Sequence, residues 1–470
     1  MQTEIDRALV PRVACVLLLT AVAMAQQTPA LFKPFSGPQA FGDEATQARA
    51  GLPVKRSRMV QIDISQINLV AAQKILREKP KAFGRDDSHP LAELQVLKQL
   101  RLNLFDDKTL NADLRRITIS PDSKTVVWSG TIVDMKFGQV TLATTGTSVS
   151  GNVTTDSGSL YEIRPVVHHD GAGFIFEMDQ REFPKEGEPI RVRTPEGVAD
   201  VSPGTDDGSK LDVVVVYTSS AKQAAGGDDA IKNLIAIGIQ ETNQGYANSG
   251  VIQRVRLVHA AEVQYDESEG FDKALERLAN PNDGYMDDVP KLRDKYGADL
   301  VSLWINNKQL CGLAYLMDKP SPSFESKAYS VVHVGCATGY YSFGHEMGHN
   351  QGCQHDRANA TGSPGAFSYS YGFQETSGET VFRTIMAYDC SPSCPRVNYW
   401  SNPGIQYQGM PTGIAINDGA AADNAETLNS TRRIAAGWRQ SVVAPSGVAS
   451  STNKSKSQRA VSTAAPPTKK

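Results

Sequence analysis

The stretch from Phe343 to Asp356 constrains this chain more than any other, because it holds three histidines and one glutamate in a regular pattern. His345 and His349 are four residues apart, so on an α-helix their imidazoles lie about 40° apart around the axis and roughly 6 Å along it. Both rings can therefore reach one metal ion. Glu346 projects from the neighbouring flank, where it can take a proton from a bound water without acting as a ligand.

His355 follows His349 by six residues, and a continued helix would carry its ring to the wrong side, about 9 Å further along. The helix is therefore expected to end near Gly352, where a residue without a Cβ can take the left-handed conformation and turn the chain back. Three neutral imidazoles leave a fourth coordination position open, which distinguishes a catalytic zinc site from a closed structural one. The pattern predicts one catalytic Zn²⁺ held by His345, His349 and His355.

The complete pattern, His-Glu-x-x-His-x-x-Gly-x-x-His, resembles the metzincin signature of zinc endopeptidases. Asp356, which follows the third histidine, is similar to the adamalysin or reprolysin branch. The best overall match is to secreted reprolysin-like bacterial proteases, which include the peptidyl-Asp metalloendopeptidases, and it covers roughly residues 211–439. This resemblance implies an α/β catalytic domain with a twisted mixed sheet, long helices and a zinc cleft.

The resemblance also implies roles for residues around the metal. Met386, in the run 384–388, matches the methionine turn and would form an apolar floor, while Asp356 would orient the loop that carries His355. Tyr388 stands where astacins and serralysins carry a tyrosine that approaches the zinc, whereas adamalysins usually do not. We expect its phenol to assist the oxyanion or to ligate the metal weakly; the alternative is a buried tyrosine whose hydroxyl finds another partner.

Substrate recognition follows from the same resemblance. An edge strand is expected to hold extended substrate by main-chain pairing, and residues 328–334 are the candidate. Cleavage on the amino side of acidic residues is also implied, which requires a fixed cation in a partly dry pocket. Arg396 is the first candidate for that cation and Arg383 the second. The alternative is an apolar pocket shaped by Tyr399 and Trp400.

The first 25 residues have the features of a signal peptide. Arg7 and Arg12 precede an apolar run from 13 to 25 that ends in Ala-Met-Ala. Because the run is too short to span a membrane, we expect cleavage before Gln26, secretion to the extracellular space or periplasm, and no stable membrane anchor. A net charge of −3 without basic runs gives no reason to expect nucleic acid, so protein or peptide substrates are the expected partners.

The cysteines support an exported protein. Apart from Cys15 in the apolar run, they all lie in the C-terminal half, at positions 311, 336, 353, 390 and 394. Their odd number leaves at least one thiol unpaired or paired between chains. We expect Cys311 to pair with Cys336, and Cys353 to pair with Cys390 or Cys394; the alternative is that all five are reduced.

With 470 residues the chain is long enough for two or more domains. Residues 26–208 are expected to form a β-rich propeptide of meander type, with a flexible leader at 26–57 and an exposed linker at 186–210. Residues 209–440 are the expected catalytic domain and 441–470 a disordered tail. The expected strands lie at 99–105, 124–133, 140–145, 159–163, 173–177, 211–217, 251–259 and 299–305, and the expected helices at 228–247, 286–296 and 424–438.

Two functions fit these residues. The first is a secreted zinc endopeptidase made as a proprotein, or zymogen, in which zinc activates a water and Glu346 acts as the general base. The second is a non-catalytic adhesion or binding module that keeps a structural zinc site. The presence of Glu346 beside all three histidines favours the enzyme. Ca²⁺ is compatible with either function, but no residue pattern assigns a calcium site or an oligomeric state.

Overall fold

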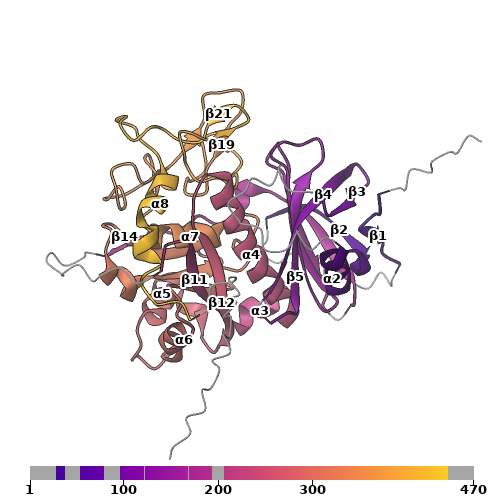
Figure 1. The fold of residues 1–470 in the computed structure, drawn as a ribbon, viewed down its shortest axis with the longest axis horizontal. Helices are drawn as coiled ribbons and strands as arrows, with labels where there is room; N and C mark the ends of the chain where they lie inside the picture. Colours follow the sequence, from indigo (N-terminus) through magenta and orange to yellow (C-terminus); the bar gives the residue numbers. More distant parts are fainter. Residues whose placement is uncertain are drawn as a thin grey trace, which may run out of the picture.

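The computed structural model describes residues 28–36, 53–78, 96–120, 122–167, 169–192 and 206–442. The expected signal peptide and nearly all of the expected tail lie outside these ranges. Among the described residues, no helix has both the length and the apolar character that crossing a membrane requires. The described chain forms two sheets, one from each half of the sequence, which lie on opposite sides of one long helix (Figure 1).

The N-terminal half forms a nine-stranded antiparallel sheet, so the predicted β meander is confirmed. Strands β3 to β9 follow one another in sequence order, and β2 then pairs with β9 and with β1. The strands are β1 (Phe32–Pro34), β2 (Val54–Ile62), β3 (Lys98–Phe105), β4 (Lys108–Ile119), β5 (Thr125–Ile132), β6 (Gln139–Thr145), β7 (Ser148–Thr154), β8 (Leu160–Pro165) and β9 (Ala172–Met178).

Two features of this half differ from the expectations. The expected flexible leader supplies β1 and the start of β2, because Phe32 and Leu31 bury their side chains in the sheet core. A helix that was not expected, α2 (Leu69–Glu78), covers the sheet, preceded by a 3₁₀ turn at Ile64–Gln66. Trp128 of β5 anchors this region, since its indole Nε1 donates to the carbonyl of Ile67 over 2.6 Å.

The C-terminal half contains a six-stranded mixed sheet in the order β10-β14-β15-β13-β11-β12. Strands β11, β12, β13 and β15 are parallel, and β14 is antiparallel to β15. Every residue of β11 after its first is buried, as expected for a strand covered on both faces. The strands are β10 (Ile190–Val192), β11 (Lys210–Thr218), β12 (Arg254–Val263), β13 (Leu300–Ile305), β14 (Gly312–Met317) and β15 (Tyr329–His333).

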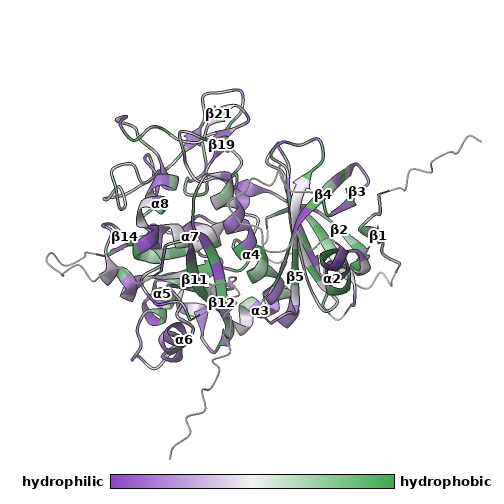
Figure 2. Cartoon of the chain, viewed as in Figure 1, coloured by the Kyte–Doolittle hydropathy of each residue, from purple (hydrophilic) through white to green (hydrophobic). Residues whose placement is uncertain are grey.

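Helices and short hairpins complete this half. The helices are α3 (Ser219–Ala225), α4 (Asp228–Asn248), α5 (Phe271–Leu278), α6 (Asp288–Tyr296), α7 (Ser342–Asn350) and α8 (Asn424–Ala435). The short strands are β16 (Gln354–Asp356), β17 (Tyr371–Gly372), β18 (Gln374–Glu375), β19 (Phe382–Arg383), β20 (Gln406–Tyr407) and β21 (Met410–Pro411). The outer helix α6 is mainly hydrophilic, in contrast to the apolar strands inside (Figure 2).

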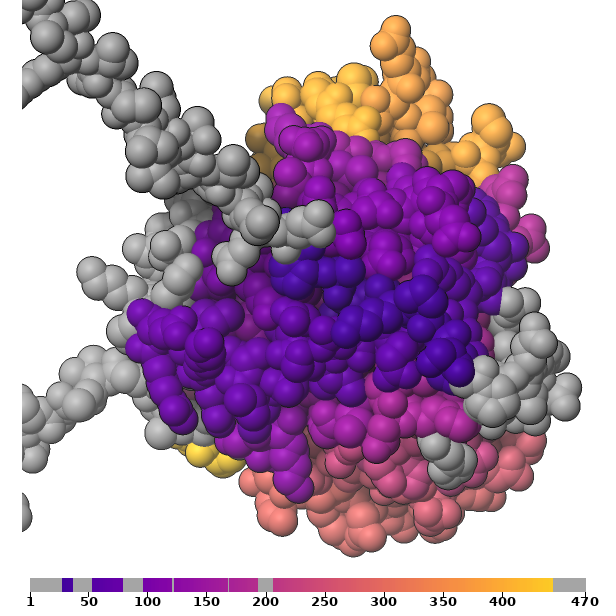
Figure 3. Space-filling model, turned by 90° about the vertical axis from the view of Figure 1, so that its right-hand side faces the viewer, coloured from indigo at the N-terminus to yellow at the C-terminus, as the bar shows by residue number. Residues whose placement is uncertain are grey.

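Helix α4 joins the two halves. It packs on β12 of its own sheet and on β5, β6 and β7 of the N-terminal sheet. Val127 and Ala143 of the N-terminal sheet belong to the same buried cluster as Ile231 and Leu234 of α4. Seen from the N-terminal side, the first half of the chain covers most of the face of the second (Figure 3). The two halves therefore share a continuous core.

The strand predicted at 328–334 is confirmed as β15, but its predicted position at the edge of the sheet is wrong. β15 lies inside the sheet, between β13 and β14, and all five of its residues are buried. β14, which the sequence reading did not identify, stands on the outer side and pairs with β15 in antiparallel fashion. All six residues of β14 are buried, and helices α7 and α5 pack on it. Its outer edge pairs in parallel with β10, a three-residue strand.

The cysteine pairing is confirmed in one part and wrong in another. Cys311 and Cys336 form a disulfide, as expected. Cys390 pairs with Cys394 across a short turn, which leaves Cys353 as a buried free thiol. Cys353 follows α7 directly and is held near the start of α8, where its sulfur lies 3.8 Å from the carbonyl of Asn424. Its position under α8 excludes the expected bond.

Candidate active site

Helix α7 and the turn after it bring three histidines together. His345 and His349 lie on α7, which ends at Asn350. Gly352 then takes a φ of +94°, and a Cβ on it would come within 2.4 Å of the Cβ of Ala366. The predicted helix end near this glycine is thus confirmed. The chain turns back into β16, which carries His355.

The three imidazoles converge on one point. The Nε2 atoms of His345, His349 and His355 lie 3.1 Å from one another. Nδ1 of His345 contacts the carbonyl of Ile385, and Nδ1 of His349 that of Cys353, each over 2.8 Å. Because a carbonyl only accepts, the bond of His349 places its proton on Nδ1 and leaves the lone pair on Nε2. Tetrahedral zinc with Zn–N bonds of about 2.0–2.1 Å needs ligand spacings of about 3.3–3.4 Å, so these residues fit such an ion.

Glu346 lies beside the histidines with its carboxylate unengaged. The side chain is fully buried, and neither of its oxygens has a hydrogen-bond partner. Burial, together with the nearby carboxylate of Glu186, raises the pKa of Glu346 well above its ordinary value. Gly312 of β14 makes room for it, since a Cβ there would meet Oε1 of Glu346 at 2.3 Å. The carboxylate is available for proton transfer at the metal side of the cleft.

The segment around Met386 packs against helix α7 beside the histidines. Met386 is fully buried, and its sulfur would lie 3.0 Å from a Cβ placed on Gly348 of α7. Asp356 ties the loop of the third histidine to this segment, because its Oδ2 accepts from the main-chain N–H of Tyr388 over 3.0 Å. It also accepts from the side chain of Asn359.

Tyr388 faces the metal site. Its ring packs on that of His355, with 4.2 Å between the ring centres. Its hydroxyl donates to the main-chain carbonyl of Glu186 over 2.8 Å. Burial raises the pKa of this phenol, so it stays protonated and acts as a donor.

The two candidate arginines have different environments. Arg396 is completely buried, and its Nη1 lies 2.6 Å from Oε1 of Glu186. Its Nη2 lies 2.7 Å from Nδ1 of His345, so the cation stands directly behind a metal-site histidine. Arg383 is equally buried, but it donates to the carbonyls of Ala387 and Cys394. Arg383 therefore braces the chain after Met386.

The aromatic residues proposed for an apolar pocket lie elsewhere. Trp400 packs against Gly348 and Tyr246 under α7. Tyr399 belongs to an aromatic cluster with Phe137 and Tyr407 at the boundary between the two halves. Trp400 therefore supports α7, whereas Tyr399 lines the small cavity between the two halves.

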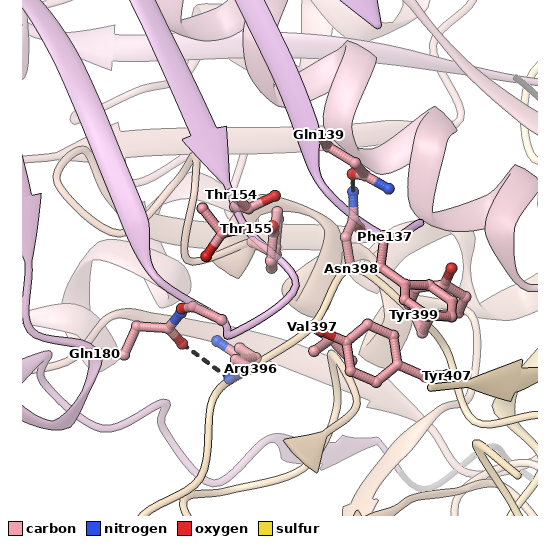
Figure 4. A pocket seen from close by; sticks show the side chains of 12 residues that line it. Phe137, Gln139, Thr154, Thr155, Gln180, Arg396, Val397, Asn398, Tyr399 and Tyr407 are labelled. Carbon is pink, nitrogen blue, oxygen red and sulfur yellow. Dashed lines mark hydrogen bonds between the residues drawn. The ribbon is translucent and has the colours of Figure 1, made fainter. Parts of the chain in front are cut away.

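The N-terminal sheet holds the segment that carries Arg396. The main-chain N–H of Arg396 donates to Oε1 of Gln180 over 2.9 Å, and Nδ2 of Asn398 donates to Oε1 of Gln139 over 3.5 Å. Figure 4 shows these bonds crossing from one half of the chain to the other around a small cavity. The position of Arg396 thus depends on both halves.

A segment that was expected to be an exposed linker lies along β14 instead. Glu186, Gly187 and Pro189 are buried. Gly187 donates its N–H to the carbonyl of Gly312 over 2.8 Å, and Cys311 donates to the carbonyl of Lys185 over 2.9 Å. The chain then continues as β10 along β14. Lys-Glu-Gly-Glu-Pro has the composition of a turn, so the sequence alone does not predict that this segment is buried.

Comparison with known proteins agrees with this geometry. Residues 207–401 match the Reprolysin_5 model, described as metallo-peptidase family M12. A peptidyl-Asp metalloendopeptidase of Stenotrophomonas maltophilia (strain R551-3) is 37% identical over 68% of this chain and 75% of its own length. Proteins of the same name are 36% identical in Xanthomonas campestris pv. campestris, over 63% of this chain and 69% of theirs, and 33% identical in Pseudomonas fragi, over 42% and 100%.

Three convergent histidines and a buried glutamate beside them are the features of a metallopeptidase site. The chain belongs to metallopeptidase family M12 and is a metalloendopeptidase acting on proteins or peptides. Most of its length is similar to the peptidyl-Asp metalloendopeptidases.

Proposed function

We propose that the protein is a secreted, zinc-dependent endopeptidase made as a proprotein, which cuts before acidic residues. The convergence of the Nε2 atoms of His345, His349 and His355 is the observation that carries this proposal. Three imidazoles with a free carboxylate beside them are typical of a hydrolytic zinc site with an open position.

The reaction depends on a few side chains. A bound Zn²⁺ supplies Lewis acidity, polarising the scissile carbonyl and lowering the pKa of water to about 7. Glu346 takes the proton from the attacking water and gives it to the leaving amine. Tyr388 donates a hydrogen bond to the carbonyl oxygen as negative charge develops on it. Support for this role comes from its bond to a main-chain carbonyl in the cleft, that of Glu186.

The preference for acidic residues rests on Arg396. Its guanidinium is buried and holds a carboxylate, that of Glu186, at 2.6 Å. A buried cation without an anion carries a large desolvation cost, so a substrate side chain that supplies a carboxylate is favoured over an apolar one. The relatives are named for cleavage at Asp, which agrees with such a pocket.

A peptide library tests this specificity. We expect cleavage before Asp and Glu, and we expect Arg396→Met to abolish the acidic preference while Arg383→Met, the matched buried control, keeps it if the protein folds. Preference for Leu or Phe after the cut, with Asp and Glu disfavoured, would rule the acidic pocket out.

The N-terminal β domain is proposed to be the propeptide, spanning residues 26–208 behind a signal peptide at 1–25, with the catalytic domain at 209–440. Its contacts with the segment that carries Arg396 support a role in shaping the cleft during folding. Mass spectrometry of secreted protein tests this organisation. A mature form that begins within 193–209 is expected, and an active mature form that still begins at residue 26 would contradict it.

A further inference from the structure

Residues 185–192, here termed the cleft segment, occupy the binding edge of the active site. Two main-chain hydrogen bonds, from Cys311 to Lys185 and from Gly187 to Gly312, fix its first half. β10 then pairs in parallel with residues 315–317 of β14. An extended peptide added to a sheet edge in this way occupies the main-chain positions that a substrate strand would use.

Glu186 places its carboxylate in the innermost part of the cleft. Oε1 accepts from Nη1 of Arg396 and from Oγ of Ser342, each over 2.6 Å. The ion pair is almost completely buried, with side-chain exposures of 0% for Arg396 and 3% for Glu186. Ser342, the first residue of α7, was not foreseen from the sequence, and it completes a pocket of two donors around one carboxylate oxygen.

The carboxylate of Glu186 also lies close to His345 and Glu346. Oε2 is buried, and a ligand atom of Glu186 lies within 4.8 Å of atoms of His345 and Glu346. The carboxylate therefore stands beside both the metal-binding histidine and the general base. Tyr388 at the same time donates to the main-chain carbonyl of Glu186. Each group that the proposed reaction uses on the substrate is thus in contact with, or next to, this one residue.

We infer that Glu186 is an internal substitute for the acidic side chain of a substrate, and that it keeps the proprotein inactive by filling the Arg396 and Ser342 pocket while the cleft segment covers β14. This inference rests on the proposed function, since it assigns the pocket to acidic substrate residues. The buried guanidinium is neutralised by Glu186 before processing and is freed for a substrate carboxylate afterwards.

Amide hydrogen exchange on the full-length chain, kept metal-free so that it cannot cut itself, tests the seating of the cleft segment. We expect Glu186→Gln to speed exchange in residues 185–192 and 311–317 at least tenfold, because it leaves Arg396 buried without a counterion. Glu182→Gln, the same change at an exposed position four residues away, is the matched control and should alter neither region.

A second variant perturbs the segment without touching the ion pair. Gly187→Ala places a Cβ 2.8 Å from Leu313 and 2.9 Å from the carbonyl of Gly312, so it should push the segment off β14. Release by both variants supports the inference. Faster exchange in Gly187→Ala but not in Glu186→Gln would overturn the role of Glu186. Unchanged exchange in both variants would overturn the inference that the cleft segment covers β14.

Activity of the unprocessed, zinc-loaded protein completes the test. Glu186→Gln is expected to cleave a small peptide at least ten times faster than the parent proprotein, and Glu182→Gln at the parent rate. If the peptide library shows no acidic preference but Glu186→Gln still releases the cleft segment, the specificity proposal is wrong. In that case Glu186 does not imitate a substrate side chain, but the cleft segment still keeps the proprotein inactive. An acidic preference combined with unchanged latency in Glu186→Gln overturns the inference itself.

Discussion

Gly348 lies between Glu346 and His349 on α7, and its lack of a side chain allows the helix to pack closely on Trp400 and Met386. A Cβ at this position would lie 2.7 Å from Trp400 and 3.0 Å from the sulfur of Met386. The histidine rings of α7 are fixed from the other end by the carbonyls of Ile385 and Cys353. Hydrogen bonds of this kind set the ring orientation before a metal binds.

Replacing Glu346 with Ala should separate catalysis from metal binding. If Glu346 transfers protons while the three histidines hold the metal, as proposed, kcat/KM should fall by about a hundredfold to ten-thousandfold. Zinc content by atomic absorption and the circular dichroism spectrum should match those of the parent. Substantial activity in a zinc-replete, folded variant would remove Glu346 from the mechanism.

Tyr388→Phe deletes one hydroxyl and keeps the ring that packs on His355. If the phenol stabilises the developing oxyanion, kcat/KM of the processed enzyme should fall by at least about tenfold, since one such donor is commonly worth more than that. Steady-state kinetics on a peptide substrate measures the change. A loss smaller than about threefold would show a tyrosine that serves packing only.

A disulfide holds the start of strand β14 in place. The disulfide from Cys311 to Cys336 joins the residue before β14 to the loop after β15, across 25 positions. The N–H of Cys311 also holds the cleft segment through Lys185. The bond thus stabilises the start of β14 as well as the loop leading to α7.

Removing this disulfide should loosen the edge. For a closed loop of this length the constraint is worth about 3–4 kcal/mol, so Cys311→Ala with Cys336→Ala should lower Tm by about 5–10 °C. The matched control is Cys390→Ala with Cys394→Ala, which opens a loop of four positions worth about 2 kcal/mol. Differential scanning calorimetry measures Tm for both double variants. An equal or larger fall in Tm for the control would contradict the larger stabilisation assigned to the Cys311–Cys336 bond.

The contact between the two halves of the molecule buries ionisable groups. Glu241 of α4 accepts from Nδ2 of Asn152 over 2.7 Å and from the N–H of Gly339 over 2.8 Å. Burial raises the pKa of Glu241 to about 7, with Arg164 nearby partly opposing the shift. Burial also raises the pKa of Glu162, which pairs with Arg164 in the same contact.

Docking of the two halves should therefore depend on pH. Once they separate, Glu241 regains an ordinary pKa near 4.5, so the docked form binds the extra proton. Docking should be strongest below pH 4.5 and should weaken as pH rises through about 7. Size-exclusion chromatography of a chain cut once between residues 193 and 205 should show more dissociation at pH 8 than at pH 5.5.

Glu241→Gln provides the control for this dependence. It removes the carboxyl group whose pKa burial raises to about 7 and keeps the side-chain volume, so the difference between pH 5.5 and pH 8 should shrink. Dissociation that varies as much in the variant as in the parent would assign the pH effect to other groups.

Local features of the sequence predicted local structure well. The spacing of His345 and His349 depends only on the helical repeat, and Gly352 permits a backbone turn that few other residues adopt. Alternation and turn residues likewise predicted the meander, and the apolar face of α4 predicted that helix to within one residue at its end. These patterns are set by the backbone within a few residues.

Only the tertiary structure decided which segments lie beside the three histidines. Glu186 and Arg396 are 210 positions apart, and no periodicity links them. β14 became the outer strand because β15 inserted beside β13, and Cys353 stayed free because α8 packs over it. Such contacts depend on how whole elements pack, since a short polar stretch can be solvated or buried with equal local geometry. The sequence by itself determined the metal-binding chemistry, whereas packing between distant segments decided what occupies the cleft beside it.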